Sequence, residues 1–346
     1  MSTASDAVNA ADPLHLIEVA DGPSFPQAAG DRILRAARRA AIGFPYECNS
    51  GSCGVCRFEL LKGSVEVAWP EAPAWSDRDR RKGRYLGCQT SATSDCVIKV
   101  LTAPVEVELT APRRLGARLV ASRPLTHDMT SIMLATAGAA ASFLPGQYAV
   151  VSTSGAAAGR CYSMANLPNE QGLWEFIVKR VPGGKESGNF VDAGLGTEFV
   201  VDGPYGHAYF RHEDPSDIAC IAGGSGFAPM LSIARAAHAS GHRVHFFYGG
   251  RRPHDMNCVA ELHSLASFGR TLHLHSAISA AVEREDDAWV GDRGLLPAVL
   301  ETRLAPEFSR LRFYAAGAPP LMAALEDLLV TRSGVSPDRI HFDRFA

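Results

Sequence analysis

Four cysteines near the start of the chain have the spacing of an iron–sulfur site. Cys48, Cys53 and Cys56 lie in the run CNSGSCGVC, at C-x4-C-x2-C spacing, and Cys88 follows in YLGCQT. This spacing is typical of a [2Fe-2S] cluster, in which each of the two irons takes two thiolate ligands. The glycines of the same run tolerate unusual backbone angles, so the loop can bend round a cluster and point its amides at the sulfurs. The sequence therefore predicts that these four cysteines hold a [2Fe-2S] cluster.

A structural zinc site is the alternative for the same cysteines. Such a site also uses four thiolates, but it more often has two C-x2-C pairs, and this chain has one. The other cysteines stand singly in apolar or strand-like surroundings, and we predict that they are small core residues: Cys96, Cys161, Cys220 and Cys258.

A cluster of this kind accepts single electrons, so another cofactor must supply them. A nicotinamide delivers two electrons as hydride, and a flavin is the usual cofactor that accepts a pair and releases them one by one. The run RCYSMAN offers three suitable side chains on one predicted strand. Arg160 can pair with a pyrophosphate, Tyr162 can stack on an isoalloxazine ring, and Ser163 can hydrogen-bond near the ring nitrogens. The alternative is an ordinary strand with a surface arginine.

Two glycine-rich runs suit phosphate groups. VPGGKESGNFVDAG opens a short predicted helix with Ser187 near its start, where amides can bind a phosphate, and a simple capped turn is the alternative. GGSGFAP follows the apolar strand IACIA and precedes a helix, the context in which a glycine loop cradles a nucleotide. Gly223, Gly224 and Gly226 would let the backbone approach the cofactor, and Pro229 suits the first helical turn.

The elements that would position these residues fall into three regions. Residues 14–104 combine strand-like segments with DRILRAARRAA, a helix with Asp31 as its candidate N-cap, which predicts a small mixed α/β domain. Within it, CRFELLKGSVEV predicts two strands with a turn at Lys62-Gly63. Residues 113–212 hold short β-rich runs separated by turn residues, which predicts an antiparallel barrel or sandwich. In residues 213–346 strand, glycine loop and helix alternate, which predicts a doubly wound parallel sheet with ligands at the strand C-termini.

Composition narrows the class of protein. Of 346 residues, 46% are hydrophobic and 21% are charged, so we expect two or three folded domains and no extensive disorder. The formal net charge of -3 predicts no strong attraction to nucleic acid. The N-terminal residues lack a secretory pattern, and no apolar stretch approaches the roughly 20 residues that span a bilayer. We therefore expect a cytoplasmic protein without membrane attachment, in which the eight cysteines do not form disulfides.

Taken in chain order, the runs CNSGSCGVC, PGQY, RCYS, GPYG, GGSGFAP, FYGGR and GAPP resemble a known family. They are similar to the reductases of bacterial multicomponent oxygenases, which belong to the ferredoxin-NADP reductase superfamily with a plant-type [2Fe-2S] ferredoxin fused in front. FPYECNSGSCG, WPEAP and IHFDRF look most like the reductase of toluene and related aromatic diiron monooxygenases. Reductases of xylene monooxygenase and of benzoate-type dioxygenases are the next most similar. The resemblance implies a β-grasp ferredoxin domain, an FAD-binding antiparallel β-barrel and an NAD-binding α/β domain, in that order.

The resemblance also implies roles by position. One group of residues would contact FAD: Arg160, Tyr162, Ser163, Val178, Lys179, Gly184, Lys185 and Ser187. A second group would contact NADH: Gly223, Gly224, Ser225, Gly226, Tyr248, Gly249, Arg251 and Gly317. Ser163 and Phe345 are the candidate catalytic residues, with Phe345 covering the flavin ring until nicotinamide displaces it. A hydrophobic plug at the chain end is the alternative for Phe345.

The chain departs from the family pattern at two places. The family often has CGPP where this chain has Ala316-Gly317-Ala318-Pro319, so the cysteine that commonly sits near the hydride-transfer centre is missing. We nevertheless expect NADH to reduce the flavin. An acidic residue commonly precedes the C-terminal aromatic residue, and Asp343 is the nearest match.

The predicted function is that of an NADH-dependent reductase, which passes electrons through FAD and the cluster to a partner oxygenase, directly or through a ferredoxin. We expect a monomer whose partner is a diiron hydroxylase acting on a hydrocarbon or aromatic. A reductase for a Rieske-type ring-hydroxylating dioxygenase is the main alternative, and a zinc-bound, non-catalytic nucleotide-sensing module is a remote one. NADH is expected over NADPH, although Arg251 and Arg252 offer charge for a 2'-phosphate.

A basic run near Cys88 is a candidate docking surface. The run DRDRRKGR gathers positive side chains that can steer an acidic partner, and a solvated charged face is the commoner explanation for such a run. Its basic residues are Arg78, Arg80, Arg81, Lys82 and Arg84.

Overall fold

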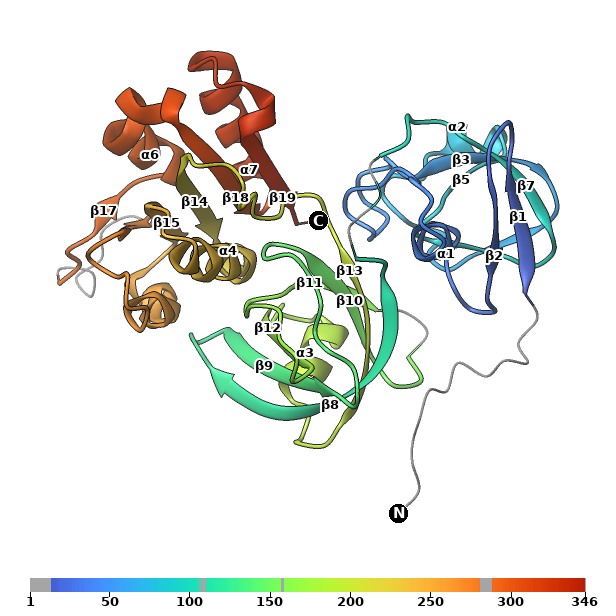
Figure 1. Cartoon of the computed structure of the whole chain (residues 1–346), viewed down its shortest axis with the longest axis horizontal. Helices are drawn as coiled ribbons and strands as arrows, with labels where there is room; N and C mark the ends of the chain where they lie inside the picture. The colour runs from blue at the N-terminus through green and yellow to red at the C-terminus, as the bar shows by residue number, and fades with distance from the viewer. Residues whose placement is uncertain (1–13, 106, 108–109, 157–158, 281–287, 346) are drawn as a thin grey trace. The chain divides into compact units, whose positions relative to one another are not determined.

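The computed structural model describes residues 14–105, 107, 110–156, 159–280 and 288–345. The chain divides into two compact units, Met1–Pro112 and Arg113–Ala346 (Figure 1). The second unit contains both the β-rich region and the region of alternating strands and helices. Each unit is described below by itself.

A five-stranded mixed sheet forms the first unit, in the order β2-β1-β7-β3-β5. β1 and β7 run parallel, and the other pairs of this sheet are antiparallel. Helix α1 (Ile33–Arg39) buries Ile33, Leu34 and Ala37, whose spacing places them on one face of the helix. The strands are β1 (His15–Val19), β2 (Ser24–Gln27), β3 (Arg57–Lys62), β5 (Arg84–Leu86) and β7 (Cys96–Val100), with a separate pair of β4 (Val65–Val67) and β6 (Thr90–Ala92).

One local prediction for this unit is corrected, and another is confirmed. The N-cap of α1 is Arg32 rather than Asp31. The Asp31 carboxylate instead accepts hydrogen bonds from the backbone N–H of Arg32 and from the side chain of Arg39, so it braces the helix by an ion pair. The two strands predicted to turn at Lys62-Gly63 are present as β3 and β4, and each pairs with other strands, β3 with β5 and β7 and β4 with β6. Gly63 has a φ of 97°, and a Cβ there would lie 2.3 Å from the Asp95 carbonyl oxygen.

An antiparallel six-stranded sheet opens the second unit, in the order β11-β10-β13-β8-β9-β12. An isolated bridge between Met164 and Phe176 brings its two ends together, so the sheet is nearly closed into a barrel. Alternate residues of the strands fill its interior, among them Leu134, Val151 and Phe199. Its elements are β8 (Arg113–Pro124), β9 (Met129–Thr136), β10 (Tyr148–Thr153), β11 (Arg160–Ser163), β12 (Leu173–Lys179), α3 (Lys185–Val191) and β13 (Glu198–Tyr205).

A parallel six-stranded sheet completes the second unit, in the order β17-β16-β15-β14-β18-β19. Helix α4 packs in one apolar cluster, and α6 and α7 pack in another, so both faces of the sheet are covered (Figure 1). β14 is central, with β15 on one side and β18 on the other, and the strand order reverses there. The strands are β14 (Asp217–Gly223), β15 (Val244–Gly250), β16 (Leu272–Ile278), β17 (Asp292–Arg293), β18 (Leu311–Gly317) and β19 (Ile340–Arg344). The helical segments are η1 (Gly224–Gly226), α4 (Phe227–Ala239), η2 (Pro253–Val259), α5 (Ala260–His263), α6 (Leu296–Leu304), η4 (Ala305–Arg310), α7 (Pro319–Glu326), η5 (Asp327–Arg332) and η6 (Pro337–Arg339).

The barrel and the parallel sheet are joined by one apolar cluster at their contact. Ile177 of the barrel belongs to the same apolar cluster as α4. Arg235 on α4 donates to the Glu175 carboxylate on β12 at 2.8 Å and to the Ala165 carbonyl oxygen at 2.8 Å. Because Glu175 is buried, this ion pair and the apolar contacts fix the two regions against each other.

None of the helices in the described residues is long and apolar enough to cross a membrane.

Candidate functional site

The structure brings the four predicted cluster cysteines together in two pairs. The sulfurs of Cys48 and Cys53 lie 3.2 Å apart, and those of Cys56 and Cys88 lie 3.4 Å apart. Cys56 and Cys88 are buried, whereas Cys48 and Cys53 are half-buried. Two pairs of thiols on one loop and an adjoining turn match the donor set of two irons with two thiolates each.

The loop places backbone amides where they donate hydrogen bonds to a cysteine sulfur. The backbone N–H groups of Ser50 and Cys53 each donate to the Cys48 sulfur at 3.4 Å. Gly51 and Gly54 have φ values of 91° and 75°, so both positions need the freedom of glycine. Amide donors of this kind stabilise negative charge on a sulfur, which is how a protein tunes such a cluster.

Arg57 braces the cysteine loop and was missed by sequence reasoning. Its guanidinium donates to the carbonyl oxygens of Gly54 and Ala74 at 3.1 and 2.7 Å. A Cβ on Gly54 would lie 2.6 Å from this guanidinium, so the side chain packs directly on the loop. Arg57 also pairs with Asp79 at 3.4 Å. The basic helix α2 (Asp77–Arg81) is thereby linked to the loop.

Proton sharing within each pair perturbs the thiols. The Cys53 thiol donates to Cys48 and lowers the pKa of Cys48 to about 4. A hydrogen bond from Cys56 likewise lowers the pKa of Cys88. The donors show the opposite shift, since a hydrogen bond donated to the neighbouring sulfur stabilises the protonated thiol and raises the pKa of Cys53 and of Cys56. Each pair thus contains one sulfur with a lowered pKa, and thiolate is the form that binds iron.

The other cysteines follow the prediction with one exception. Cys96, Cys220 and Cys258 are buried, as expected for core residues, and burial raises the pKa of the Cys258 thiol to about 12. Cys161 is only half-buried, because it lies on the short strand β11 at the end of the barrel sheet. Among the eight cysteines, all within the described residues, none forms a disulfide.

The predicted flavin residues lie on β11. Arg160 is exposed, Tyr162 is half-buried and Ser163 is buried. The Tyr162 ring packs against Phe190 of α3 at a centroid distance of 5.1 Å, and burial raises the pKa of Tyr162 to about 12. The Ser163 hydroxyl donates to the Asp343 carboxylate at 3.0 Å, which joins the barrel to the last strand of the parallel sheet.

The residues around α3 have mixed roles. Gly184 is the N-cap of α3. The buried Ser187 hydroxyl accepts from the Val181 N–H at 3.0 Å, so this side chain holds the preceding turn, as the capped-turn alternative requires. The side chain of Lys185 is not among those that the structure describes.

Two further predicted flavin contacts lie at the end of β12. Val178 is fully buried in the barrel core, so only its backbone can reach a ligand. The Lys179 ammonium lies 3.1 Å from the Asp128 carboxylate.

The glycine loop after β14 lies at the point where the strand order reverses. Gly224 has a φ of 55°. Gly226 packs so closely on β18 that a Cβ would lie 2.1 Å from the Ala316 carbonyl oxygen. Ser225 is half-buried between these glycines. A Cβ added to Gly223 would lie 2.7 Å from the Leu321 side chain. The sheet thus presents a strand end, a glycine loop and the start of α4 to one ligand, as a nucleotide site requires.

Tyr248, predicted to lie at the adenosine side, has a side chain that contacts the glycine loop. It is buried beneath the glycine loop, and its hydroxyl donates to the Gly224 carbonyl oxygen at 3.4 Å, so it supports the loop. Gly249 and Arg251 follow at the exposed end of the strand, where the Arg251 N–H donates to Asp255.

The C-terminal segment meets the end of β18. Gly317 has a φ of 153°, and its carbonyl oxygen accepts from the Phe345 N–H at 3.0 Å. The Phe345 side chain is half-buried against the apolar cluster that includes α4. Asp343 and Phe345 are therefore held at the edge of the sheet beside Gly317. The hydrogen bond between Asp343 and Ser163 joins residues that are 180 positions apart in the chain.

Comparisons with known proteins agree with this geometry. A 2Fe-2S iron-sulfur cluster binding domain matches residues 19–93, an oxidoreductase FAD-binding domain residues 116–210, and an oxidoreductase NAD-binding domain residues 220–327. The ferredoxin–NAD(P)(+) reductase CarAd of Metapseudomonas resinovorans is 40% identical over 321 residues, covering 92% of this chain and 95% of that protein. The ferredoxin–NAD(+) reductase component of the alkene monooxygenase system of Xanthobacter autotrophicus is 37% identical, with coverage of 94% and 98%. The solved ferredoxin reductase in carbazole 1,9a-dioxygenase has a TM-score of 0.89 at 34% identity, covering 96% of this chain and 99% of its own.

Fold and site together define an iron–sulfur flavoprotein oxidoreductase with a nicotinamide nucleotide domain. The chain belongs to the family of ferredoxin–NAD(P)+ reductase components of oxygenase systems. The predicted fold class, enzyme class and cofactors are confirmed at this level. The individual site residues and the boundaries 14–104, 113–212 and 213–346 stay predictions.

Proposed function

We propose that this protein takes hydride from NADH and delivers single electrons to a partner oxygenase. The observation that carries the proposal is the pairing of the four sulfurs of Cys48, Cys53, Cys56 and Cys88, which gives the chain a one-electron site in addition to its nucleotide domains. When bound, FAD accepts a hydride and releases electrons singly, and the [2Fe-2S] cluster accepts them one at a time. The same four cysteines would hold the irons.

The second unit contributes the residues for flavin and nucleotide. Arg160 is exposed and supplies positive charge for a pyrophosphate, and Tyr162 presents a ring anchored by Phe190. Because the Ser163 hydroxyl donates a hydrogen bond to Asp343, the lone pairs of the Ser163 oxygen remain available to an N–H of the ligand. Phe345, whose N–H donates to the Gly317 carbonyl oxygen, would exclude water from the same edge.

The decisive experiment combines metal analysis with two cysteine variants. Purified protein is expected to contain iron and acid-labile sulfide in equal amounts, and its visible bands should bleach when NADH is added. Cys88→Ser should lose the cluster and the reduction of cytochrome c, whereas flavin reduction by NADH continues. Cys96→Ser is the matched control, because Cys96 is also buried in the first unit but its sulfur donates only to backbone oxygens.

Zinc without iron would overturn the proposal and favour the nucleotide-sensing module. Equal loss of the cluster in Cys96→Ser and Cys88→Ser would also contradict it, since the damage would then reflect folding of the unit rather than ligation.

For the partner, we infer a diiron hydroxylase acting on a hydrocarbon or aromatic compound. The 37% identity to the reductase component of an alkene monooxygenase system supports this choice. A Rieske-type dioxygenase is the second candidate, favoured by the structural match to the ferredoxin reductase in carbazole 1,9a-dioxygenase. Electron delivery to one purified oxygenase of each class, with and without an added ferredoxin, distinguishes the two.

The remaining proposals concern the cofactor, the assembly and the compartment. We favour NADH over NADPH, and a comparison of flavin reduction at low concentrations of each nucleotide tests this preference.

We also propose that the protein is a monomer and that it is cytoplasmic. The absence of disulfides among the eight cysteines supports the second statement. Light scattering of the loaded protein and cell fractionation test the two statements.

A further inference from the structure

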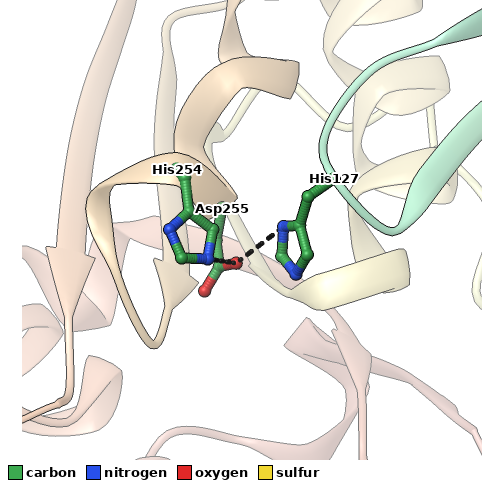
Figure 2. A group of neighbouring side chains, drawn as sticks. All are labelled: His127, His254 and Asp255. Carbon is green, nitrogen blue, oxygen red and sulfur yellow. Dashed lines mark ion pairs between the residues drawn. The ribbon is translucent and has the colours of Figure 1, made fainter. Parts of the chain in front are cut away.

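Two histidines and an aspartate from different parts of the second unit meet at its surface. His127 lies in the turn between β8 and β9 of the barrel, whereas His254 and Asp255 lie in η2, after β15 of the parallel sheet (Figure 2). One ligand atom from each residue lies within 4.8 Å of the other two. We propose that His127, His254 and Asp255 form a binding site for a divalent transition-metal ion of the zinc type.

The distances suit such an ion. The Asp255 Oδ1 atom lies 3.6 Å from His127 Nδ1 and 3.5 Å from His254 Nε2. A tetrahedral zinc ion with bonds of about 2.0–2.1 Å separates neighbouring ligand atoms by about 3.3–3.4 Å, so these side chains need only small movements to bind it. Both imidazoles are about half exposed, with side-chain values of 52% and 53%, which gives the ion a path from solvent and a fourth position for water.

The carboxylate of Asp255 is fixed in the orientation that binding requires. Its Oδ2 atom accepts from the backbone N–H groups of Arg251 and Arg252 at 2.7 and 3.0 Å. The Oδ1 atom is thereby turned toward the two imidazoles (Figure 2). A ligand held by backbone amides loses little freedom when it binds a metal.

A second carboxylate stands behind His127. Asp128 Oδ2 lies 3.6 Å from His127 Nε2, the ring nitrogen that would not bind the ion. Asp128 is itself held by the Lys179 ammonium at 3.1 Å and by the Thr126 hydroxyl at 3.0 Å. Metal-binding histidines commonly donate their second N–H to a carboxylate, which orients the ring and increases its basicity. We therefore assign Asp128 as a positioning residue for the site.

The donor set selects the class of ion. Two imidazoles and one carboxylate favour zinc and similar transition ions, whereas magnesium and calcium prefer oxygen ligands throughout. A bound ion would tie the β8–β9 turn of the barrel to η2 of the nucleotide domain. The Nζ atom of Lys179, which holds Asp128, would lie 3.7 Å from a Cβ added to Gly224 in the glycine loop, so the metal site borders the proposed nucleotide site.

The test measures zinc binding to protein loaded with flavin and cluster. Equilibrium dialysis against Zn²⁺, with zinc and iron counted in the same sample, should show one zinc per chain and no loss of iron. His127→Ala and His254→Ala should each weaken binding by at least about tenfold, and Asp128→Asn by about tenfold. Mg²⁺ should not compete. His212→Ala is the matched control and should bind as the wild type does, because His212 is exposed in the same unit but pairs only with Glu213.

A second measurement separates this site from adventitious surface histidines. Because the ion links two parts of the fold, Zn²⁺ should raise the thermal midpoint of the wild-type protein by several degrees and leave that of His127→Ala unchanged. Absence of zinc binding at submillimolar concentrations, zinc uptake accompanied by iron loss, or equal affinity in His127→Ala and His212→Ala would each overturn the proposal.

Discussion

The packing of Gly226 on β18 yields a quantitative prediction for Gly226→Ala. The backbone of Gly226 is helical, with φ -58°, so alanine is not excluded by its backbone angles. The added Cβ would, however, lie 2.1 Å from the Ala316 carbonyl oxygen and 2.5 Å from the Ala316 carbonyl carbon. Both are backbone atoms of a buried central strand, so relief requires a movement of the glycine loop on the order of 1 Å. Overpacking of this kind costs about 1–3 kcal/mol of unfolding free energy.

The same movement should impair the proposed nucleotide site. A displacement of about 1 Å at a group that positions a substrate can cost about a hundredfold in rate. We therefore expect flavin reduction at low NADH concentration to fall by about a hundredfold in Gly226→Ala while FAD and iron contents stay normal. Anaerobic stopped-flow absorbance at the flavin band measures the rate, and urea unfolding measures the stability.

A neutral glycine in the same unit provides the control. A Cβ on Gly116 of β8 would meet no atom within 4 Å, so Gly116→Ala should change neither quantity. A Gly226→Ala protein with the wild-type rate and stability would refute the packing argument. Lost stability with an unchanged rate at low NADH concentration would instead refute the assignment of this loop to the nucleotide.

Three further predictions concern pH, an internal ion pair and docking. Burial lowers the pKa of His275 and of His341 to about 4. In the unfolded state these histidines take up protons near pH 6.5, whereas in the folded state they stay neutral until the pH approaches 4. The free energy of unfolding should therefore be highest above pH 6.5 and should fall as the pH is lowered toward 4, which urea midpoints at pH 8, 6.5 and 5 should show. Glu175→Gln leaves the Arg235 cation of α4 with only its longer pair to Glu261 at 3.3 Å, so we expect a loss of about 2 kcal/mol, and an unchanged urea midpoint would contradict the role of the pair with Glu175. Reversal of the exposed Arg78 and Arg81 to Glu should slow electron delivery to the oxygenase at low salt and leave cytochrome c reduction intact, whereas delivery equal to wild type would remove α2 from the docking surface.

The choice of Arg78 and Arg81 shows how the structure refines a sequence pattern. The run DRDRRKGR predicts only a cluster of charge. In the structure Arg80 lies over the Trp75 ring at 4.0 Å and donates to the Pro70 carbonyl oxygen, so its replacement would also disturb local packing. A test of steering must use the arginines that face solvent.

Local patterns predicted the parts of the site that lie close together in the chain. The cysteine run encodes its own loop, because the spacing of the thiols and the positive φ values of Gly51 and Gly54 are properties of one short segment. The alternation of strands and helices likewise predicted the parallel sheet, since each element carries its own periodicity. Asp31 was misplaced as an N-cap because an aspartate next to a helix serves equally as an ion-pair partner, and only the position of Arg39 decides between them.

Contacts between distant segments could not be predicted from such patterns. Ser163 and Asp343 meet only because the end of β11 and the edge strand β19 converge in the folded unit. Tyr248 lies next to the glycines at the end of its strand, and register within the sheet turns its ring inward, where it supports the glycine loop. The cluster of His127, His254 and Asp255 has no signal in the sequence, because its members come from the β8–β9 turn and from η2, which lie far apart in the chain.

The glycine loop illustrates why a correct motif can have several physical causes. A run such as GGSG is usually explained by the approach of a phosphate, but its glycines differ in this fold. Gly224 needs a positive φ, whereas Gly226 has an ordinary helical φ and must be glycine because β18 passes too close for a side chain. Substitution of Gly226 therefore tests strand packing, and substitution of Gly224 tests backbone conformation. Because both movements would reach the nucleotide through the same short loop, only the difference between the stability and rate effects can assign each glycine its role.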